Sequence, residues 1–203
     1  MTTVYRYFFS LLRIALYEEK PNLASFRNFR EWQSLYDLSS AQGVLAIVWD
    51  GLQKLPPDCQ PSRELRLKWA YNVERIELYY RKQRNAITRL AAFYRSHDLP
   101  LMLLKGYGLS LSYPVPEHRP CGDIDIWLYG RQQEADDLMR RCLGIPIEED
   151  VHHHTTFRFD GILVENHYDF VNVHAHASNR KIEYLLKEYS AEPCEKIDLE
   201  GHR

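Results

Sequence analysis

The sequence lacks the features of several protein classes. None of its apolar runs approaches the ~20 residues that an α-helix needs to cross a bilayer, which argues against a membrane protein. Its 203 residues carry 26 Lys and Arg against 28 Asp and Glu, a net charge of −2. A protein that coats nucleic acid needs a large basic excess. We therefore expect neither a membrane nor a nucleic acid as the main partner.

Cysteine is also scarce. The four cysteines (Cys59, Cys121, Cys142 and Cys194) are far apart and form no Cys-x-x-Cys pair. This spacing is not that of a small disulfide framework, and the chain is long enough to bury a hydrophobic core without cross-links. The sequence thus predicts reduced thiols and a cytoplasmic protein.

The hydrophobic pattern changes near residue 100. Before that point, apolar residues recur at spacings of three and four, which predicts helices over 4–16, 25–38, 39–52 and 62–96. After it, short apolar runs predict strands over 101–104, 124–129, 155–160 and 162–173, and helices over 109–113 and 132–142. Asp160-Gly161 is a typical hairpin turn. We predict an α+β fold, with a helical N-terminal region over 1–98 and a small mixed β-sheet domain over 99–203.

Asp123 and Asp125 are the first candidates for chemistry. One residue separates them, so in extended backbone both carboxylates face the same way and can chelate one hard cation. Their neighbours are apolar, and two anions in an apolar strand are costly unless they meet a metal or lie at an accessible end. The alternative interpretation is a polar strand edge with Arg119 as a nearby counter-charge.

A lysine and two glycines form the second candidate. Lys105-Gly106-Tyr107-Gly108 follows the strand predicted over 101–104 and precedes the short predicted helix. At such a junction, backbone amides, a lysine and a helix N-terminus can hold a phosphate. Glycines after a strand can equally serve the turn alone. The resulting order is strand, glycine turn, helix, loop and Asp-x-Asp strand.

This order resembles the nucleotidyltransferase superfamily, whose palm domain is like that of DNA polymerase beta. More closely, three segments resemble a bacterial family of uncharacterised nucleotidyltransferases: Leu103-Leu104-Lys105-Gly106, Tyr113-Pro114 and Arg119-Pro120-Cys121-Gly122-Asp123-Ile124-Asp125-Ile126. The resemblance implies a palm domain with flanking helices, Mg²⁺ held by Asp123 and Asp125, and a nucleoside triphosphate at the glycine turn. It also implies transfer of a nucleoside monophosphate, with loss of pyrophosphate, to the hydroxyl of an unknown acceptor, for which we expect a small molecule.

The superfamily also uses a third carboxylate from a later strand, as a metal ligand or as the base for the acceptor hydroxyl. Glu165 is the lone acid in the apolar run 162–167 and is the candidate for this role, with Asp169 as its rival. The candidates for substrate binding are Lys105, Gly106, Gly108, Ser110 and Arg119.

Two features favour a different function. Tyr107 stands where the superfamily usually has Ser or Gly. Members of the family generally continue into a further helical region, so we expect this chain to be a natural short form or a truncated product that lacks part of the acceptor site. Both features favour a catalytically silent module of the same fold that binds a nucleotide or a partner protein.

The histidines suggest a third possibility. The run His152-His153-His154, with His167, His174 and His176 on nearby segments, would indicate a histidine-metal hydrolase if it bound zinc. No His-Glu-x-x-His or Cys-x-x-Cys spacing accompanies the run. We therefore expect these histidines to have structural or substrate-contacting roles.

Overall fold

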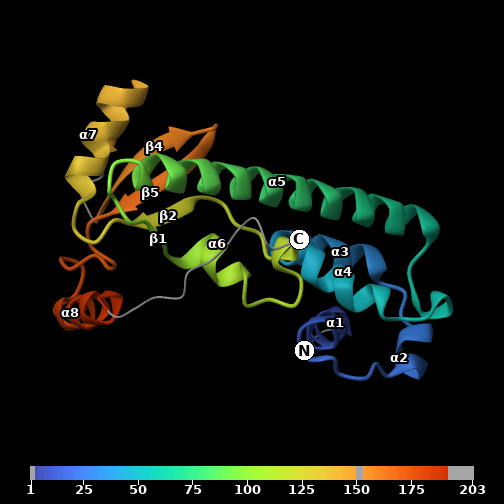
Figure 1. Ribbon diagram of the computed structural model, residues 1–203. Coiled ribbons are helices and arrows are strands. Elements are labelled where there is room, and N and C mark those ends of the chain that lie inside the picture. Colours follow the sequence, from blue (N-terminus) through green and yellow to red (C-terminus); the bar gives the residue numbers. More distant parts are fainter. Residues whose placement is uncertain (1–2, 150–152, 192–203) are drawn as a thin grey trace. The chain divides into compact units, whose positions relative to one another are not determined.

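The computed structural model describes residues 3–149 and 153–191. It confirms the predicted α+β fold: helices come first in the chain, and a mixed β-sheet with flanking helices follows (Figure 1). The chain forms two compact units, Met1–Arg81 with Leu109–Pro120, and Lys82–Gly108 with Cys121–Arg203. The domains predicted over 1–98 and 99–203 remain a prediction.

The first unit is helical within the part of the chain that the structure describes. Its elements are α1 (Thr3–Tyr17), α2 (Leu23–Arg27), α3 (Trp32–Ala41), α4 (Leu45–Gln53), the 3-10 turns η1 (Pro57–Cys59) and η2 (Pro116–His118), and the first part of α5 (Arg63–Arg95). α5 has 33 residues and is continuous in Figure 1, which confirms the helix predicted over 62–96.

Large aromatic side chains fill the core of this unit. Trp69 on α5 is fully buried and donates its indole N–H to the carbonyl of Leu45 at 3.0 Å. The ring of Tyr36 packs edge-on against Trp69, with the ring centroids 5.2 Å apart. Helices α1 and α4 can pack closely because Gly51 has no β-carbon, which would otherwise collide with the carbonyl of Leu11. The apolar residues with helical spacing thus form the buried core of this unit, as their spacing predicts.

Two predicted helices of the first unit are wrong in their bounds. The helix predicted over 25–38 is two helices, because residues 28–31 break it. This break lets Phe26, Phe29 and Trp32 all reach the core. The helix predicted over 39–52 begins only at Leu45. Ser39 belongs to the preceding helix, where its buried hydroxyl donates to the Leu35 carbonyl at 2.7 Å.

The second unit is built on a mixed sheet. Its strands are β1 (Met102–Leu103), β2 (Ile124–Trp127), β3 (Glu148–Glu149), β4 (His154–Phe159) and β5 (Ile162–His167), in the order β1-β2-β5-β4-β3. β2 and β5 are parallel, and the other neighbouring pairs are antiparallel. The helices are the last part of α5, α6 (Lys105–Ser110), which extends past the boundary of the unit, α7 (Gln132–Leu143) and α8 (Asn179–Ser190).

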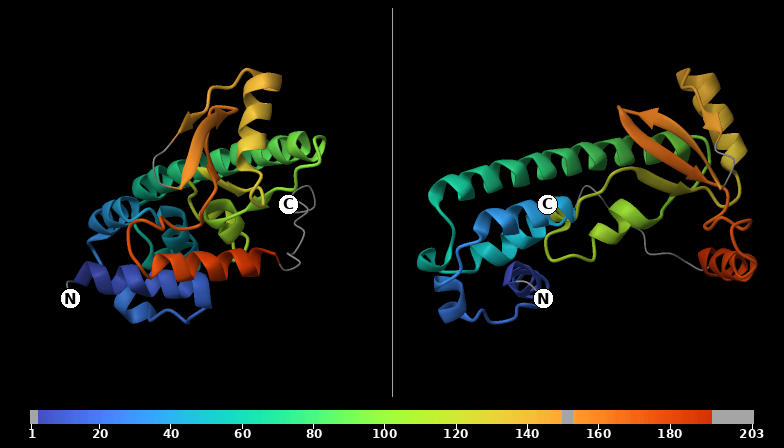
Figure 2. Two further views of the ribbon diagram at one scale, coloured as in Figure 1. Left: turned by 90° about the vertical axis from the view of Figure 1, so that its left-hand side faces the viewer. Right: turned by 180° about the vertical axis from the view of Figure 1, so that it is seen from behind.

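The β4–β5 hairpin lies beside α7 in both views of Figure 2. Asp160 and Gly161 both have positive φ (53° and 75°), as the predicted two-residue hairpin turn requires. Asp136 on α7 is buried and ties the helix to the hairpin. Its carboxylate accepts hydrogen bonds from Gln132 at 2.6 Å, Thr155 at 2.8 Å and Asn166 at 2.8 Å. Burial raises the pKa of Asp136 above its ordinary value, although these donors oppose the shift.

Two predicted elements of the second half of the chain are also wrong in their bounds. The short helix predicted over 109–113 lies earlier, as α6, and Gly106 within it has non-helical backbone angles. The strand predicted over 162–173 ends at His167. Asp169 therefore follows the strand and pairs with Lys187 on α8 at 2.6 Å.

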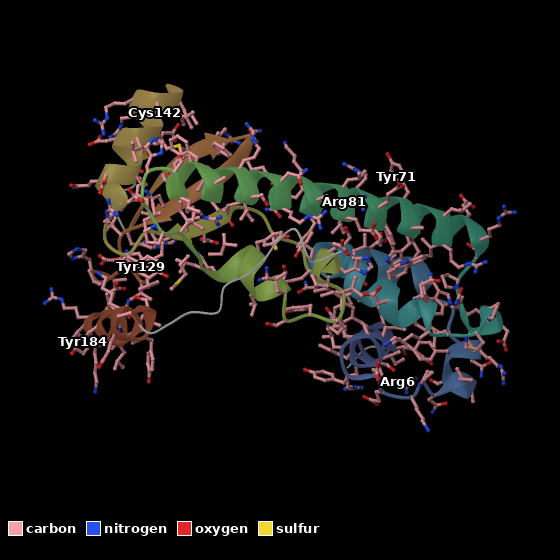
Figure 3. The ribbon with its side chains drawn as sticks, in the orientation of Figure 1. Arg6, Tyr71, Arg81, Tyr129, Cys142 and Tyr184 are labelled. Carbon is pink, nitrogen blue, oxygen red and sulfur yellow. The ribbon has the colours of Figure 1, made fainter. Side chains whose placement is uncertain are left out.

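The helices and cysteines of the described residues can be compared with the sequence predictions. None of the helices within the described ranges is long and apolar enough to cross a membrane. Cys59, Cys121 and Cys142 form no disulfide, as predicted, and Cys194 lies outside the described residues. Tyr71 and Tyr184 project from α5 and α8, 62% and 68% exposed (Figure 3).

Candidate active site

Two neighbouring strands bring the predicted carboxylates together. β2 and β5 are parallel, and Asp125 is the register partner of Glu165. His167 stands two residues after Glu165 and therefore shares its face of the sheet. One ligand atom of each of these three residues lies within 4.8 Å of the other two. We call Asp125, Glu165 and His167 the carboxylate–imidazole cluster.

Asp125 is the buried centre of this cluster. Its side chain is 1% exposed, and Oδ1 lies 3.1 Å from Nε2 of His167 and 3.0 Å from Nζ of Lys105. Burial alone would raise the pKa of Asp125, but the hydrogen bonds to His167 and Lys105 outweigh burial and hold this pKa below its ordinary value. Asp125 is therefore an anion at neutral pH.

Glu165 is more accessible than Asp125. Its side chain is 17% exposed, and Oε2 lies 3.4 Å from Nε2 of His167 and 4.0 Å from Nζ of Lys105. Burial raises the pKa of Glu165, and the negative charges of Asp123 and Asp125 raise it further. Glu165 is thus a stronger base than an ordinary glutamate, and its environment favours a nearby positive charge.

Asp123 and Lys105 complete the charges around the cluster. Asp123 comes directly before β2 and is half-buried. Burial would lower the pKa of Lys105, but its hydrogen bond to Asp125 and the charges of Asp125, Glu165 and Asp123 raise this pKa. Three carboxylates therefore act on one ammonium group.

Gly106 brings the backbone close to Asp125. Its φ of 54° and ψ of −114° are angles that residues with a side chain rarely adopt. The amide of Leu104 donates to the carbonyl of Asp125 at 3.1 Å, so β1 and the turn after it lie against β2. Gly108 packs on Leu103, whose carbonyl oxygen would lie 3.5 Å from an added β-carbon. The predicted glycine turn is therefore beside the carboxylates.

A comparison with protein families fits this arrangement. A family model described as uncharacterised nucleotidyltransferase matches residues 28–199, which is most of the chain. The chain belongs to this family. No curated protein and no solved structure matches the sequence. The predicted resemblance is confirmed, and family membership implies a nucleoside triphosphate as a substrate.

Two of the predicted substrate-binding residues, Ser110 and Arg119, belong to the first unit. Ser110 is fully buried, and its Oγ lies 2.8 Å from the hydroxyl of Tyr80. The guanidinium of Arg119 lies over the ring of Tyr113, 6.0 Å from its centroid. The proposed contacts of Ser110 and Arg119 with substrate stay predictions.

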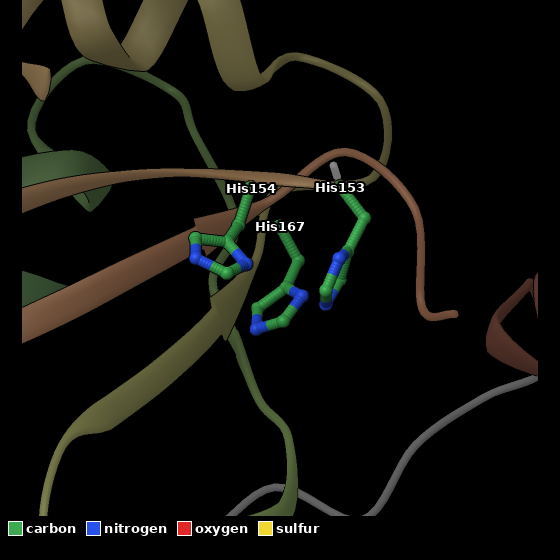
Figure 4. A group of neighbouring side chains, drawn as sticks. All are labelled: His153, His154 and His167. Atoms are coloured by element: carbon green, nitrogen blue, oxygen red, sulfur yellow. The ribbon is translucent and has the colours of Figure 1, made fainter. Parts of the chain in front are cut away.

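Three histidine rings gather at one end of the β4–β5 hairpin, as Figure 4 shows for His153, His154 and His167. The ring centroids lie 4.7 to 5.3 Å apart, and one ligand atom of each lies within 4.8 Å of the others. His152 lies outside the described residues, and His174 and His176 are exposed. We call His153, His154 and His167 the imidazole cluster.

His167 belongs to both clusters, and the sequence named it only as a neighbour of the histidine run. The sequence did carry a signal for His167, because one residue separates it from Glu165, just as one residue separates Asp123 from Asp125. The two pairs of residues can be assigned to one site only when β2 and β5 are known to be parallel neighbours. This pairing is non-local and appears only in the structure.

The residues around Asp125 fit a divalent cation. Two carboxylate oxygens and an imidazole nitrogen lie close enough together to bind one ion. The three carboxylates of Asp123, Asp125 and Glu165 also supply more negative charge than Lys105 can neutralise. The Lys105 side chain is 62% exposed, so its ammonium group can move away without unpacking a core. A cation would take over the neutralising role of this ammonium group.

Proposed function

We propose that this protein is a divalent-cation-dependent nucleotidyltransferase that transfers a nucleoside monophosphate from a triphosphate to the hydroxyl of a small-molecule acceptor. The observation that carries the proposal is the register pairing of Asp125 with Glu165, beside Asp123 and the Gly106 turn. Family membership supports the same reaction class. The thiols of Cys59, Cys121 and Cys142 agree with a cytoplasmic enzyme.

Asp123 and Asp125 would hold Mg²⁺ or a similar cation, and Glu165 would complete the site. When bound, the cation neutralises negative charge on the triphosphate and on the leaving pyrophosphate. Asp125 suits this role because it is buried and ionised. A buried anion between two strands is held in one position, which keeps the ligand oxygens preorganised.

The proton of the acceptor hydroxyl is assigned to Glu165. The oxygen of the acceptor forms a bond to the α-phosphorus, its O–H bond breaks, and the bond between the α-phosphorus and the bridging oxygen breaks. Pyrophosphate leaves with the electron pair of that bond. The Glu165 side chain is more accessible than that of Asp125, at 17% against 1% exposed, so one of its oxygens can meet the acceptor hydroxyl.

Lys105 and the backbone around Gly106 and Gly108 would hold the phosphates. The Lys105 ammonium is 3.0 Å from Asp125, so it can exchange one anion for another when a triphosphate arrives. The helix that follows Gly106 is short, so the contact rests on the lysine and the individual amides.

Calorimetry with Mg²⁺ and each of the four ribonucleoside triphosphates tests the proposal. The double variant Asp123→Asn/Asp125→Asn should fold and lose Mg²⁺-dependent triphosphate binding. Asp137→Asn is the matched control, because Asp137 is an exposed α7 residue paired with Arg140 at 3.0 Å. Equal triphosphate binding by wild type and the double variant would show that the site is elsewhere.

The second candidate is the catalytically silent module. Tyr107 favours it, because this residue is 3% exposed and presents no small hydroxyl to a phosphate as a serine would. The two candidates differ in one measurement: the enzyme releases pyrophosphate in the presence of an acceptor, whereas the module binds the triphosphate and leaves it intact. A survey of small hydroxyl compounds with a pyrophosphate assay distinguishes them.

A further inference from the structure

The unexpected member of the cluster is His167, because an imidazole nitrogen is a poor ligand for Mg²⁺ and a good one for transition metals. We propose that Nε2 of His167 is a direct metal ligand together with Asp125 and Glu165, and that this set selects Mn²⁺ or a similar first-row transition ion over Mg²⁺. The inference rests on the proposed function, because it assigns the identity of the cation at the same site.

The distances within the cluster fit this assignment. Adjacent ligands of an octahedral ion with bonds of about 2.1 Å lie about 3.0 Å apart. Nε2 of His167 is 3.1 Å from Oδ1 of Asp125 and 3.4 Å from Oε2 of Glu165. An ion can therefore enter with small side-chain movements and no change in strand register. The ligands come from adjacent parallel strands, which fix their relative heights.

The other nitrogen of His167 supports the same orientation. Nδ1 lies 3.3 Å from the backbone carbonyl of Asp169, two residues further along the chain. Metal-binding histidines usually donate their second ring N–H to a carbonyl or carboxylate, which fixes the tautomer and the ring. A bound ion would replace the proton that Nε2 shares with Asp125. With Nδ1–H donating to Asp169, the lone pair of Nε2 would then point toward the ion. The ring is 1% exposed, so water does not compete for this nitrogen.

The imidazole cluster offers a competing assignment for His167. His153 and His154 bring no negative charge, whereas Asp125 and Glu165 supply carboxylates that offset the charge of a divalent ion. The Nδ1 contact with Asp169 also commits that nitrogen of His167. The nitrogen at hydrogen-bond distance from Asp125 is Nε2, which favours the carboxylate–imidazole cluster.

Pulsed electron paramagnetic resonance of bound Mn²⁺ tests the proposal without nucleotide or turnover. The wild-type protein should show modulation from a directly coordinated ¹⁴N nucleus. His167→Gln should remove this modulation and weaken Mn²⁺ binding by about tenfold or more, since even residues behind the ligands cost about 10–100-fold. Mg²⁺ affinity, measured by competition, should change less, so the preference for Mn²⁺ over Mg²⁺ should shrink.

His153→Asn is the matched control, because it removes an imidazole that belongs only to the imidazole cluster. It should leave both the ¹⁴N modulation and the Mn²⁺ affinity unchanged. Loss of the modulation in this variant would assign the metal to the imidazole cluster and overturn the proposal. If His167→Gln fails to fold, as circular dichroism would show, the wild-type spectrum decides, and Mn²⁺ bound without ¹⁴N coupling overturns the proposal.

The same measurements distinguish a failure of the metal assignment from a failure of the proposed function. Mn²⁺ with ¹⁴N coupling but no triphosphate binding would leave the metal assignment intact and reject the nucleotidyltransferase reaction. Triphosphate binding that depends on Asp123 and Asp125, with Mn²⁺ uncoupled from ¹⁴N, would do the reverse.

Discussion

A β-carbon at Gly106 would lie 3.3 Å from Oδ2 of Asp125. The same glycine has φ 54° and ψ −114°, a region that is nearly closed to residues with a side chain. The backbone conformation thus favours glycine, and a side chain here would also push against the Asp125 carboxylate. The turn before α6 is shaped around the buried carboxylate.

Gly106→Ala should therefore destabilise the protein by about 1–3 kcal/mol, the usual cost of a strained backbone position. It should also weaken divalent-cation binding, because the methyl group displaces Oδ2 of Asp125. Gly108→Ala is the control, since its β-carbon would lie 3.5 Å from the Leu103 carbonyl, an ordinary contact. Urea unfolding measures the stability of both variants, and calorimetry measures their cation binding. Equal stabilities for the two variants would contradict the strain at Gly106.

Lys105→Met should destabilise the protein more in the absence of a divalent cation than in its presence. Without the cation, the variant loses the positive charge beside Asp125 and Glu165, and its free energy of unfolding should fall. With a saturating cation, the difference from wild type should shrink, because the ion supplies the missing charge. Thermal unfolding in EDTA and in MnCl₂ measures this. The same stability loss in both solutions would show that Lys105 is not the counter-charge of the cluster.

Asp136→Ala should be far more destabilising than Asp137→Ala. The Asp136 carboxylate accepts from Gln132, Thr155 and Asn166, so its removal deletes three buried hydrogen bonds, at about 1 kcal/mol or more for each. Asp137 is an exposed neighbour on the same helix, and its loss should cost less than about 1 kcal/mol. Chemical denaturation of both variants checks the difference, and similar stabilities would refute the role of this network.

His118 should make the stability of the first unit depend on pH. Burial would lower the pKa of His118, but hydrogen bonds to Asp50 and Glu77, at 2.8 and 3.0 Å, outweigh burial and raise it. The charged imidazole thus stabilises the folded state fully below the unfolded pKa of about 6.5. This contribution is lost as pH rises through the higher folded pKa.

The free energy of unfolding should accordingly decrease from mildly acidic toward alkaline pH, and His118→Gln should flatten that slope. His174→Gln serves as the control, because His174 is exposed. Urea titrations over this pH range measure the slope. A wild-type stability that does not change there would reject the charged state of His118.

Local patterns in the sequence predicted much of the fold. The apolar spacing of residues 62–96 predicted α5, and Asp160-Gly161 predicted the β4–β5 hairpin, because both signals depend on neighbours in sequence. The break at 28–31 was missed because Phe29 continues the apolar spacing of a helix. Tertiary packing of three aromatic side chains overrides that local signal.

The candidate site was predictable only in part. Glu165 was found because it is the one acid in an apolar run, and the structure places it beside Asp125. His167 was not assigned to the carboxylates, because its place depends on the pairing of β2 with β5. Asp169 was placed on a strand that ends before it, and its carboxylate meets Lys187 instead.

The parallel pairing of β2 with β5 has a consequence for the order of folding. α7, β3 and β4 all lie between these strands in the chain, so Asp125 and Glu165 meet only after a long loop has closed. Contacts of this separation are costly in chain entropy and form slowly. The proposed metal ligands should thus be among the last groups to assemble, and a bound cation should slow unfolding while leaving the folding rate unchanged.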